Sequence, residues 1–276
     1  MKKLIHRLLN KFGYRVYNIS KEAKYLKIQK WNFLKKIPVR TIIDIGANEG
    51  QFANEISNIF PLAEIYSFEP LGDCYEKLVS NFRDNKRVHT YNFALGEQEG
   101  EITFSRSSAS ASSSLLRMGN LHKKLYPHTA TLVEEKVKIK RLDDVIADLN
   151  LADHILLKID VQGAEDKVIK GSPEVLKKAS IVVTEVSYAT LYEGQPLFRD
   201  IFALLERHAF TYIGNMEQFE NPLTAAPLFA DAVFIKKEIH DRLYNSWPRF
   251  TLSQSSPGTS SDCPKNFQLI LNANCF

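Results

Sequence analysis

The segment Thr41–Phe52, with the sequence TIIDIGANEGQF, constrains the fold of this chain more than any other feature. A β-branched apolar run ends at Asp44, the chain turns through Gly46 and Gly50, and a helical pattern follows. Such a strand–turn–helix unit brings backbone N–H groups and a helix N-terminus close to a bound ligand. Asn48 replaces the middle glycine of a dinucleotide fingerprint, whose glycines let the backbone approach a pyrophosphate. The turn favours a nucleoside without a pyrophosphate, such as S-adenosylmethionine (SAM), although another nucleotide fold also fits a lone glycine-rich turn.

An acidic residue follows at the spacing that nucleoside binding requires. Glu69 comes directly after the strand pattern Glu64–Phe68, 19 residues beyond Gly50. A carboxylate at the tip of the second strand can accept hydrogen bonds from both ribose hydroxyls. The alternative is a solvated carboxylate in a turn. Given the glycine-rich turn upstream, we expect Glu69 to bind a ribose.

Strand and helix patterns alternate along the chain, which indicates a doubly wound α/β sheet. We expect strands near 41–45, 64–68, 87–92, 155–160, 181–186, 210–214 and 231–236. We expect helices near 50–59, 72–83, 142–149, 163–170 and 197–208. The last two strands flank a segment with two prolines and little helical pattern, which predicts an antiparallel hairpin that closes the sheet. An insertion from about 100 to 140 interrupts the alternation with two short strand patterns.

Two carboxylates end neighbouring strand patterns in the middle of the chain. Asp160 ends the fourth strand and Glu185 the fifth, and open α/β sheets bind ligands outside the carboxyl ends of their strands. Asp160 is the main catalytic candidate, as a base, as a hydrogen-bond partner of an acceptor, or as a metal ligand. A helix cap is the structural alternative. Together the two carboxylates could bind Mg²⁺, whereas no histidine joins them at a zinc spacing.

These features resemble the FkbM family of SAM-dependent methyltransferases over roughly residues 39–236. The matching blocks keep the family's order: DIGANEGQF at 44–52, FEP at 68–70, FALGEQEGEITF at 93–104, SSSLL at 112–116, LDDVI at 142–146 and LLKIDVQGAEDKVIKG at 156–171. One departure is Gln162, where the family usually has Glu. The resemblance implies a Rossmann-like seven-stranded sheet. It implies a SAM site formed by Asp44, Gly46, Asn48, Gly50, Glu69, Ala94 and Ser113.

The activity implied by the resemblance is methyl transfer from SAM to a hydroxyl of a sugar, glycan or related metabolite, as in polysaccharide biosynthesis. One rival is a catalytically degenerate SAM-binding partner in a glycan-assembly complex, which Gln162 keeps open. The other is a nicotinamide-dependent oxidoreductase. That enzyme would normally use the missing glycine, and no Tyr-x-x-x-Lys pair follows the fifth strand.

The insertion and the loop after the fifth strand could shape the acceptor site. The serine-rich loop 105–114 is either a flexible linker or, as in FkbM-like enzymes, a border of the cofactor and acceptor pocket. His122 and His128 could supply a base if the insertion folds over the pocket, but we expect surface histidines. Tyr188 and Tyr192 either line a sugar site or pack within their loop.

Composition agrees with one globular enzyme domain and gives no sign of nucleic-acid binding. Hydrophobic residues make up 44% and charged residues 25% of 276 residues, and the net charge of +4 is mild. Cys74, Cys263 and Cys275 have no metal spacing, which favours a reducing, cytoplasmic compartment. The oligomeric state is left open.

Both ends of the chain differ in pattern from the expected domain at 39–240. Residues 1–38 begin with a basic amphipathic helical pattern that is too short to span a bilayer. We expect it to pack on the domain's flank. The alternative is peripheral contact of residues 1–12 with the inner face of an anionic membrane. Residues 241–276 are rich in Ser, Pro, Asn and Gly, and we expect a poorly ordered tail.

Overall fold

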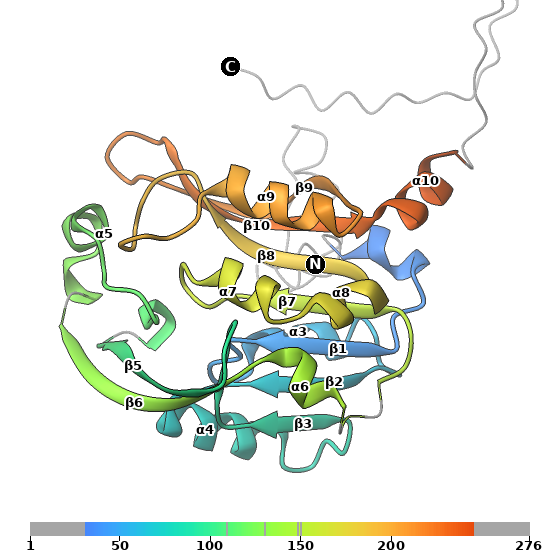
Figure 1. The fold of residues 1–276 in the computed structure, drawn as a ribbon, viewed down its shortest axis with the longest axis horizontal. Coiled ribbons are helices and arrows are strands. Elements are labelled where there is room, and N and C mark those ends of the chain that lie inside the picture. Colours follow the sequence, from blue (N-terminus) through green and yellow to red (C-terminus); the bar gives the residue numbers. More distant parts are fainter. Residues whose placement is uncertain (1–30, 109, 130, 148, 150, 246–276) are drawn as a thin grey trace, which may run out of the picture.

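The computed structural model describes residues 31–108, 110–129, 131–147, 149 and 151–245. Its main sheet has seven strands in the order β3-β2-β1-β7-β8-β10-β9 (Figure 1). The strands are β1 (Thr41–Ile45), β2 (Glu64–Phe68), β3 (Val88–Tyr91), β7 (Ile155–Ile159), β8 (Ala179–Ser187), β9 (Phe210–Glu220) and β10 (Pro227–Lys236). The predicted Rossmann-like, doubly wound sheet is confirmed.

The direction of the strands places a ligand crevice at the middle of the sheet. Strands β1, β2, β3, β7 and β8 are parallel, whereas β10 pairs antiparallel with both β8 and β9. The predicted closing hairpin is therefore confirmed. From β1 the chain builds outward to β3, then returns to add β7 on the other side of β1. Ligands of open α/β sheets bind at such a reversal, outside the carboxyl ends of the strands.

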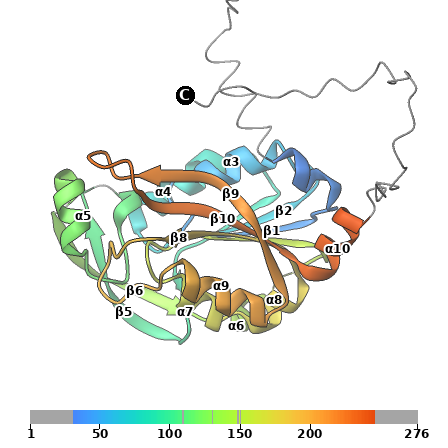
Figure 2. The ribbon, with the colours of Figure 1, turned by 90° about the horizontal axis from the view of Figure 1, so that it is seen from above.

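Helices cover both faces of the sheet (Figure 2). Successive strand side chains point to opposite faces, so Ile42 packs in one hydrophobic cluster and Ile43 in the other. The central strands are buried on both sides, which explains their largely apolar sequences. The cluster with Ile42 contains side chains of the 3₁₀ helix η1 (Asn32–Lys36), α3 (Gln51–Ser57), α4 (Gly72–Phe82) and α10 (Lys237–Asn245). The cluster with Ile43 contains side chains of α6 (Leu142–Ile146), α7 (Glu165–Lys170), α8 (Pro173–Lys178) and α9 (Phe198–Arg207).

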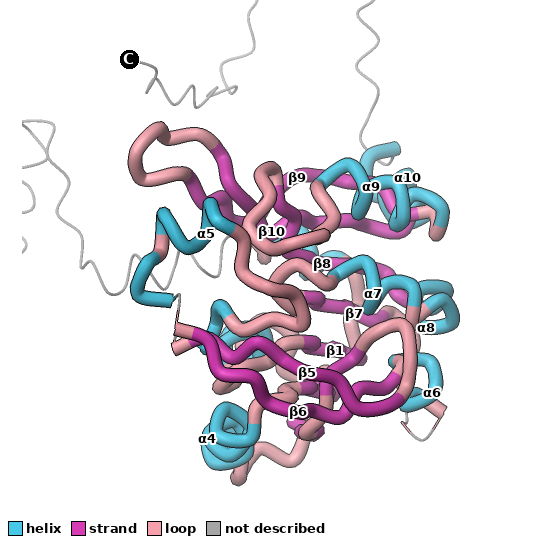
Figure 3. Tube along the Cα trace, turned by 60° about the vertical axis from the view of Figure 1, so that its left-hand side comes forward, coloured by secondary structure: helices cyan, strands magenta, loops and turns pink. Residues whose placement is uncertain are grey.

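The insertion forms a second, three-stranded sheet beside the carboxyl edge of the first (Figure 3). Its strands are β4 (Ala94–Leu95), β5 (Gly100–Ser107) and β6 (Leu132–Lys140), in the order β4-β6-β5. The two predicted strand patterns are confirmed, while β4 and α5 (Asn120–Leu125) have no counterpart in the sequence-based expectation. Short 3₁₀ turns lie at Ser110–Ser112 and Pro127–Thr129.

Several helices and strands, and the domain itself, begin or end at other residues than predicted. Helix α8, which starts with a proline at its first position, was not predicted. Gly171 ends α7 just before α8 begins, so the sequence contained no sign of a second helix. Strands β9 and β10 are longer than expected, since they continue to pair with each other beyond β8. Helix α10 crosses the predicted domain end at residue 240 and buries Ile239, so the domain continues to at least residue 245.

The remaining predictions for the chain ends fall on residues that the structure does not describe. These include the amphipathic pattern, the membrane contact of residues 1–12, Cys263, Cys275 and the tail from 246 onward. Trp31 and Leu34, from the described part of the N-terminal segment, are buried against the domain. No helix within the described ranges is both long and apolar enough to cross a bilayer.

Candidate active site

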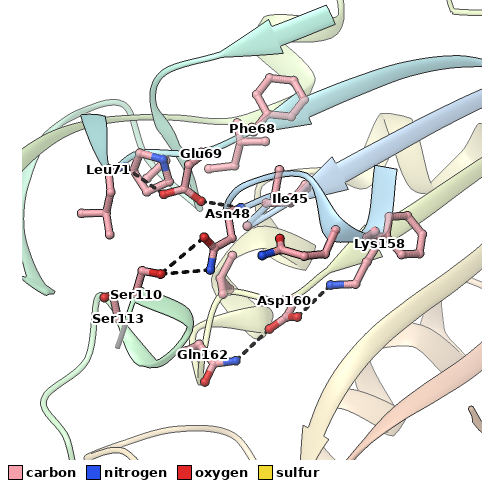
Figure 4. Close-up of a pocket in the computed structure, with 18 of the residues that line it drawn as sticks. Ile45, Asn48, Phe68, Glu69, Leu71, Ser110, Ser113, Lys158, Asp160 and Gln162 are labelled. Atoms are coloured by element: carbon pink, nitrogen blue, oxygen red, sulfur yellow. Dashed lines mark hydrogen bonds and ion pairs between the residues drawn. The ribbon is translucent and has the colours of Figure 1, made fainter. Parts of the chain in front are cut away.

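A cavity of about 400 Å³ lies at the carboxyl ends of the central strands (Figure 4). Of the predicted site residues, six line it: Gly46, Asn48, Glu69, Ala94, Ser113 and Asp160. Asp44, Gly50 and Glu185 are not among its lining residues. The topology therefore brings most of the predicted cofactor residues and the main catalytic candidate into one pocket.

The two glycines of the first turn have different roles. Gly46 has a φ of 80°, and a Cβ there would overlap the backbone carbonyl of Asp160. The absence of a Cβ at Gly46 lets the first turn cross closely over the end of β7. Gly50 has a φ of 91°, and a Cβ there would overlap the ring of Phe82 on α4. Gly50 thus serves helix packing and is not among the residues that line the cavity.

Glu69 is fixed by the backbone of two neighbouring turns. The backbone N–H of Asn48 donates to its Oε2 at 2.8 Å, and that of Leu71 donates to its Oε1 at 2.9 Å. Burial raises the pKa of Glu69 to about 7, although these two hydrogen bonds act in the opposite direction. A carboxylate has about four acceptor sites, so Glu69 can still accept hydrogen bonds from two ligand hydroxyls.

The pocket lining contains both apolar and polar side chains. The apolar ones include Phe68, Leu71, Phe93, Phe104 and Leu115. Among the polar ones, the Asn48 amide donates to the Ser110 hydroxyl at 3.3 Å, and the Ser113 hydroxyl accepts the backbone N–H of Ser107 at 3.0 Å. Ser110 and Ser113 of the serine-rich loop therefore border the pocket, in agreement with one of the two predicted roles of this loop.

Asp160 forms an ion pair with a buried lysine of the preceding strand. Lys158 Nζ lies 2.8 Å from Asp160 Oδ2, because residues two apart on a strand project to the same side. Burial alone would lower the pKa of Lys158, yet the carboxylates of Asp160, Asp44 and Asp231 raise it above its usual range. Burial likewise acts to raise the pKa of Asp160, but Lys158 and the Gln162 amide outweigh it, so that pKa is below its usual range. Asp160 is therefore ionised at neutral pH and can accept a proton.

Asp44 lies at the end of β1 with one oxygen unsatisfied. Its side chain is fully buried, and burial raises its pKa to about 6. Ser67 donates a long hydrogen bond of 3.5 Å to Oδ2, while Oδ1 has no hydrogen-bond partner within the described ranges. An unsatisfied buried acceptor is uncommon. Its position at the first strand end fits a donor group of a bound ligand or a water.

Glu185 lies behind Gln162, which separates it from the pocket. Gln162 Nε2 donates to Asp160 Oδ1 at 2.8 Å and to Glu185 Oε2 at 3.1 Å. The amide thus stands between the two carboxylates, in the place that a shared cation would need. Within the described residues no group of three or more His, Cys, Asp or Glu side chains could hold a metal ion. This donor set does not fit the suggested Mg²⁺ site.

The histidines and tyrosines of the insertion and the following loop pack against each other. His122 is 5% exposed, and its ring lies 5.1 Å from the ring of Tyr192, so the expectation of a surface residue was wrong. Burial lowers the pKa of His122. His128 is exposed, as expected. The Tyr192 hydroxyl donates toward Gln162 Oε1 at 3.1 Å, whereas the Tyr188 hydroxyl accepts a hydrogen bond from Asn215. Of the two tyrosines, Tyr192 is therefore the one that contacts the hydrogen-bond network of Asp160.

Sequence reasoning missed Lys158, Ser110 and Asp231 as pocket residues. A usable signal existed for Lys158, because it interrupts an apolar strand two positions before Asp160. Nothing local distinguishes Ser110 from the other serines of its loop, and Asp231 needs the pairing of β10 with β8 to bring it near Glu185.

A family model and a curated relative show the family to which this chain belongs. A model of the FkbM methyltransferase domain matches residues 44–212. The chain is 31% identical over 195 residues to the 2-O-methyltransferase NoeI of Sinorhizobium fredii, covering 68% of this chain and 80% of that protein. It is 26% identical over 146 residues to the hexuronic acid methyltransferase AglP of Haloferax volcanii, covering 52% and 54%. The crystal structure of methyltransferase FkbM from Methylobacillus flagellatus aligns at a TM-score of 0.43 with 11% identity, covering 72% and 44%.

Proposed function

Because this chain belongs to the FkbM methyltransferase family, we propose that it is a SAM-dependent O-methyltransferase acting on a hydroxyl of a sugar, glycan or related metabolite. The observation that carries the proposal is one pocket that contains both Glu69 and an ionised Asp160. The named activities of the relatives support the acceptor class, since NoeI is a 2-O-methyltransferase and AglP a hexuronic acid methyltransferase.

The lining of the pocket fits SAM in three parts. Glu69 would accept hydrogen bonds from the ribose hydroxyls. The apolar lining residues, which include Phe68 and Phe104, would contact the adenine. The turn Gly46–Asn48, which lines the cavity beside Glu69, would lie against the charged amino-acid tail.

The residues around Asp160 would then promote the transfer. When bound, SAM supplies a methyl group activated by a positively charged sulfur. As the acceptor oxygen bonds to the methyl carbon and the carbon–sulfur bond breaks, Asp160 would accept the hydroxyl proton. Much of the acceleration would come from holding the acceptor in line, because such a displacement depends on alignment. Lys158 would keep Asp160 ionised until the proton arrives.

Replacing Glu69 by alanine is expected to weaken SAM binding by about 1.5–3 kcal/mol, the scale of hydrogen bonds to a charged group. The side chain is 5% exposed and also satisfies the backbone N–H groups of Asn48 and Leu71, so the melting temperature is expected to fall as well. Calorimetric titration with SAM, below the melting transition of the variant, measures the affinity. Glu99→Ala, at an exposed turn, is the matched control. Unchanged affinity in folded Glu69→Ala would remove Glu69 from the site.

Parallel titrations with SAM and NAD test the proposed cofactor. We expect a heat of binding for SAM and none for NAD at the same protein concentration, because the pocket turn lacks the third glycine of a dinucleotide site. Binding of NAD in preference to SAM would favour an oxidoreductase. Binding of SAM without turnover on any hydroxyl compound would favour a degenerate binding partner.

A further inference from the structure

Gln162 connects the two carboxylates of the candidate site, as Figure 4 shows for Asp160. Its amide nitrogen donates to Asp160 and Glu185, and its amide oxygen lies 3.1 Å from the Tyr192 hydroxyl, whose one proton it shares with the Ser112 carbonyl at 3.2 Å. Only one orientation of the amide directs N–H groups at both carboxylates and an acceptor at the hydroxyl. Three partners therefore fix the side chain in a single arrangement.

The backbone of Gln162 is also held in an unusual conformation. Its φ is 56°, in the left-handed region that non-glycine residues seldom adopt. Its carbonyl accepts a hydrogen bond from the Ser114 hydroxyl at 2.5 Å, so the serine-rich loop holds it from one side. A Cβ at the adjacent Gly163 would lie 3.2 Å from atoms of Tyr192 and Gln195, so the loop after β8 packs closely against the next residue. Backbone strain of this kind persists where the surroundings impose it, often at functional sites.

The charge of residue 162 matters because carboxylates crowd this end of the pocket. Burial raises the pKa of Glu165 to about 7 and raises that of Glu185 well above its usual range. The pKa of Asp160 is not raised in this way, because Lys158 and the Gln162 amide stabilise its ionised form. A carboxylate at position 162 would replace two hydrogen bonds by repulsion. In this chain the neutral amide binds both carboxylates and adds no negative charge.

Resting on the proposed function, we propose that Gln162 is a positioning residue for methyl transfer, whose amide holds the Asp160 carboxylate toward the acceptor and ties it to Glu185. Gln162 exchanges no proton itself. Its hydrogen bond keeps one oxygen of Asp160 in place, and Lys158 holds the other. The reactive carboxylate is thus oriented before the acceptor binds, which removes part of the entropic cost of alignment.

Titratable groups from several elements act on this network. Those that affect Asp160 or its bonded partners are Lys158 on β7, Asp44 on β1, Glu165 on α7, Glu185 on β8, Asp231 on β10, and Tyr192 in the loop after β8. Lys158 is the sole cation in this set. A further carboxylate at position 162 would therefore favour retention of a proton among residues 160, 162 and 185.

The test compares the pH dependence of methyl transfer in the parent, Gln162→Glu and Gln162→Met. In Gln162→Glu we expect the acidic limb of kcat to move to higher pH by about one unit, so kcat falls about tenfold on that limb and recovers as the pH rises above it. In Gln162→Met, which adds no charge, we expect kcat to fall about 10–100-fold at every pH. The Kd for SAM, measured by titration, is expected to stay within about threefold in both variants, because the hydrogen bonds of Gln162 involve Asp160 and Glu185.

Controls separate positioning from loss of folding. Gln98→Glu adds the same charge at an exposed turn and is expected to match the parent. Rates are normalised to the SAM-binding fraction, so misfolded protein does not count. If Gln162→Glu does not fold, Gln162→Met decides alone. Parent-like kcat in Gln162→Met, or a parent-like pH profile in folded Gln162→Glu, would overturn the role of Gln162 and leave the proposed function intact. Absence of methyl transfer by the parent would overturn both.

Discussion

Replacement of Asp160 by asparagine is expected to lower kcat by about 10²–10⁴-fold while SAM binding stays within about threefold. The amide keeps the size of the side chain but cannot take up the acceptor's proton. Its oxygen can still accept a hydrogen bond from Lys158, although its NH₂ group then faces the Gln162 amide. Steady-state kinetics with saturating SAM, together with calorimetric titration, separates the chemical step from binding. Turnover within threefold of the parent in a folded, SAM-binding variant would contradict a catalytic role and leave Asp160 as a structural partner of Lys158 and Gln162.

A chelator distinguishes a base from a metal ligand at the same residue. Because the Gln162 amide occupies the space between Asp160 and Glu185, we expect EDTA to leave the kcat of the parent unchanged and added Mg²⁺ not to raise it. Loss of activity in EDTA, with recovery on adding Mg²⁺, would show that the two carboxylates rearrange around a cation.

Replacement of Lys158 by methionine is expected to affect both stability and the pH dependence of activity. The ammonium is buried beside Asp160, and Asp44 and Asp231 also act on it, so its loss leaves these carboxylates uncompensated. We expect unfolding free energy to fall by about 3 kcal/mol, the lower end for breaking a buried pair, because burial of the pair is incomplete. Denaturant titration measures this change. The pKa of Asp160 should rise without its cation, so activity lost at neutral pH should partly return as pH increases through the new pKa.

Two control variants separate the effect of losing the charge at residue 158 from the effect of losing an ion pair elsewhere. Lys158→Arg keeps the positive charge and is expected to retain a parent-like pH profile, although the planar guanidinium group fits the site less well than the ammonium group. Lys167→Met breaks an exposed ion pair with Glu97, 3.3 Å long, and is expected to change stability by no more than about 1 kcal/mol. An unchanged pH profile in Lys158→Met would show that Lys158 does not control the charge of Asp160.

The sheet could be predicted because its strands have local signals. Buried parallel strands such as β1 and β7 are short apolar runs, and each ends at an acidic residue or a glycine turn. The inserted sheet could be predicted only in part, since the two residues of β4 pair with β6 across more than forty positions. Helix α8 follows α7 after a single glycine turn, and no periodic pattern separates the two. Long-range pairing and tight turns are what sequence reasoning misses here.

The same distinction holds for the candidate site. Glu69 and Asp160 were predictable as pocket residues because strand ends in a parallel sheet meet at one edge. The role of Gly50 was not, because it depends on where α4 packs against α3. Burial of His122 depends on the docking of the insertion against Tyr192, which has no sequence pattern. The separation of Glu185 from the pocket by Gln162 likewise follows from side-chain packing in three dimensions.

Transfer of a labelled methyl group tests the central claim most directly. The parent protein and Asp160→Asn would be incubated with SAM carrying a ¹³C-labelled methyl group and a panel of neutral and acidic mono- and oligosaccharides. Mass spectrometry and NMR would then locate the label. We predict one O-¹³CH₃ group on a sugar hydroxyl with the parent, and little or none with Asp160→Asn. Label that appears on nitrogen or carbon, or that stays on SAM bound to the parent with every acceptor, would contradict the account.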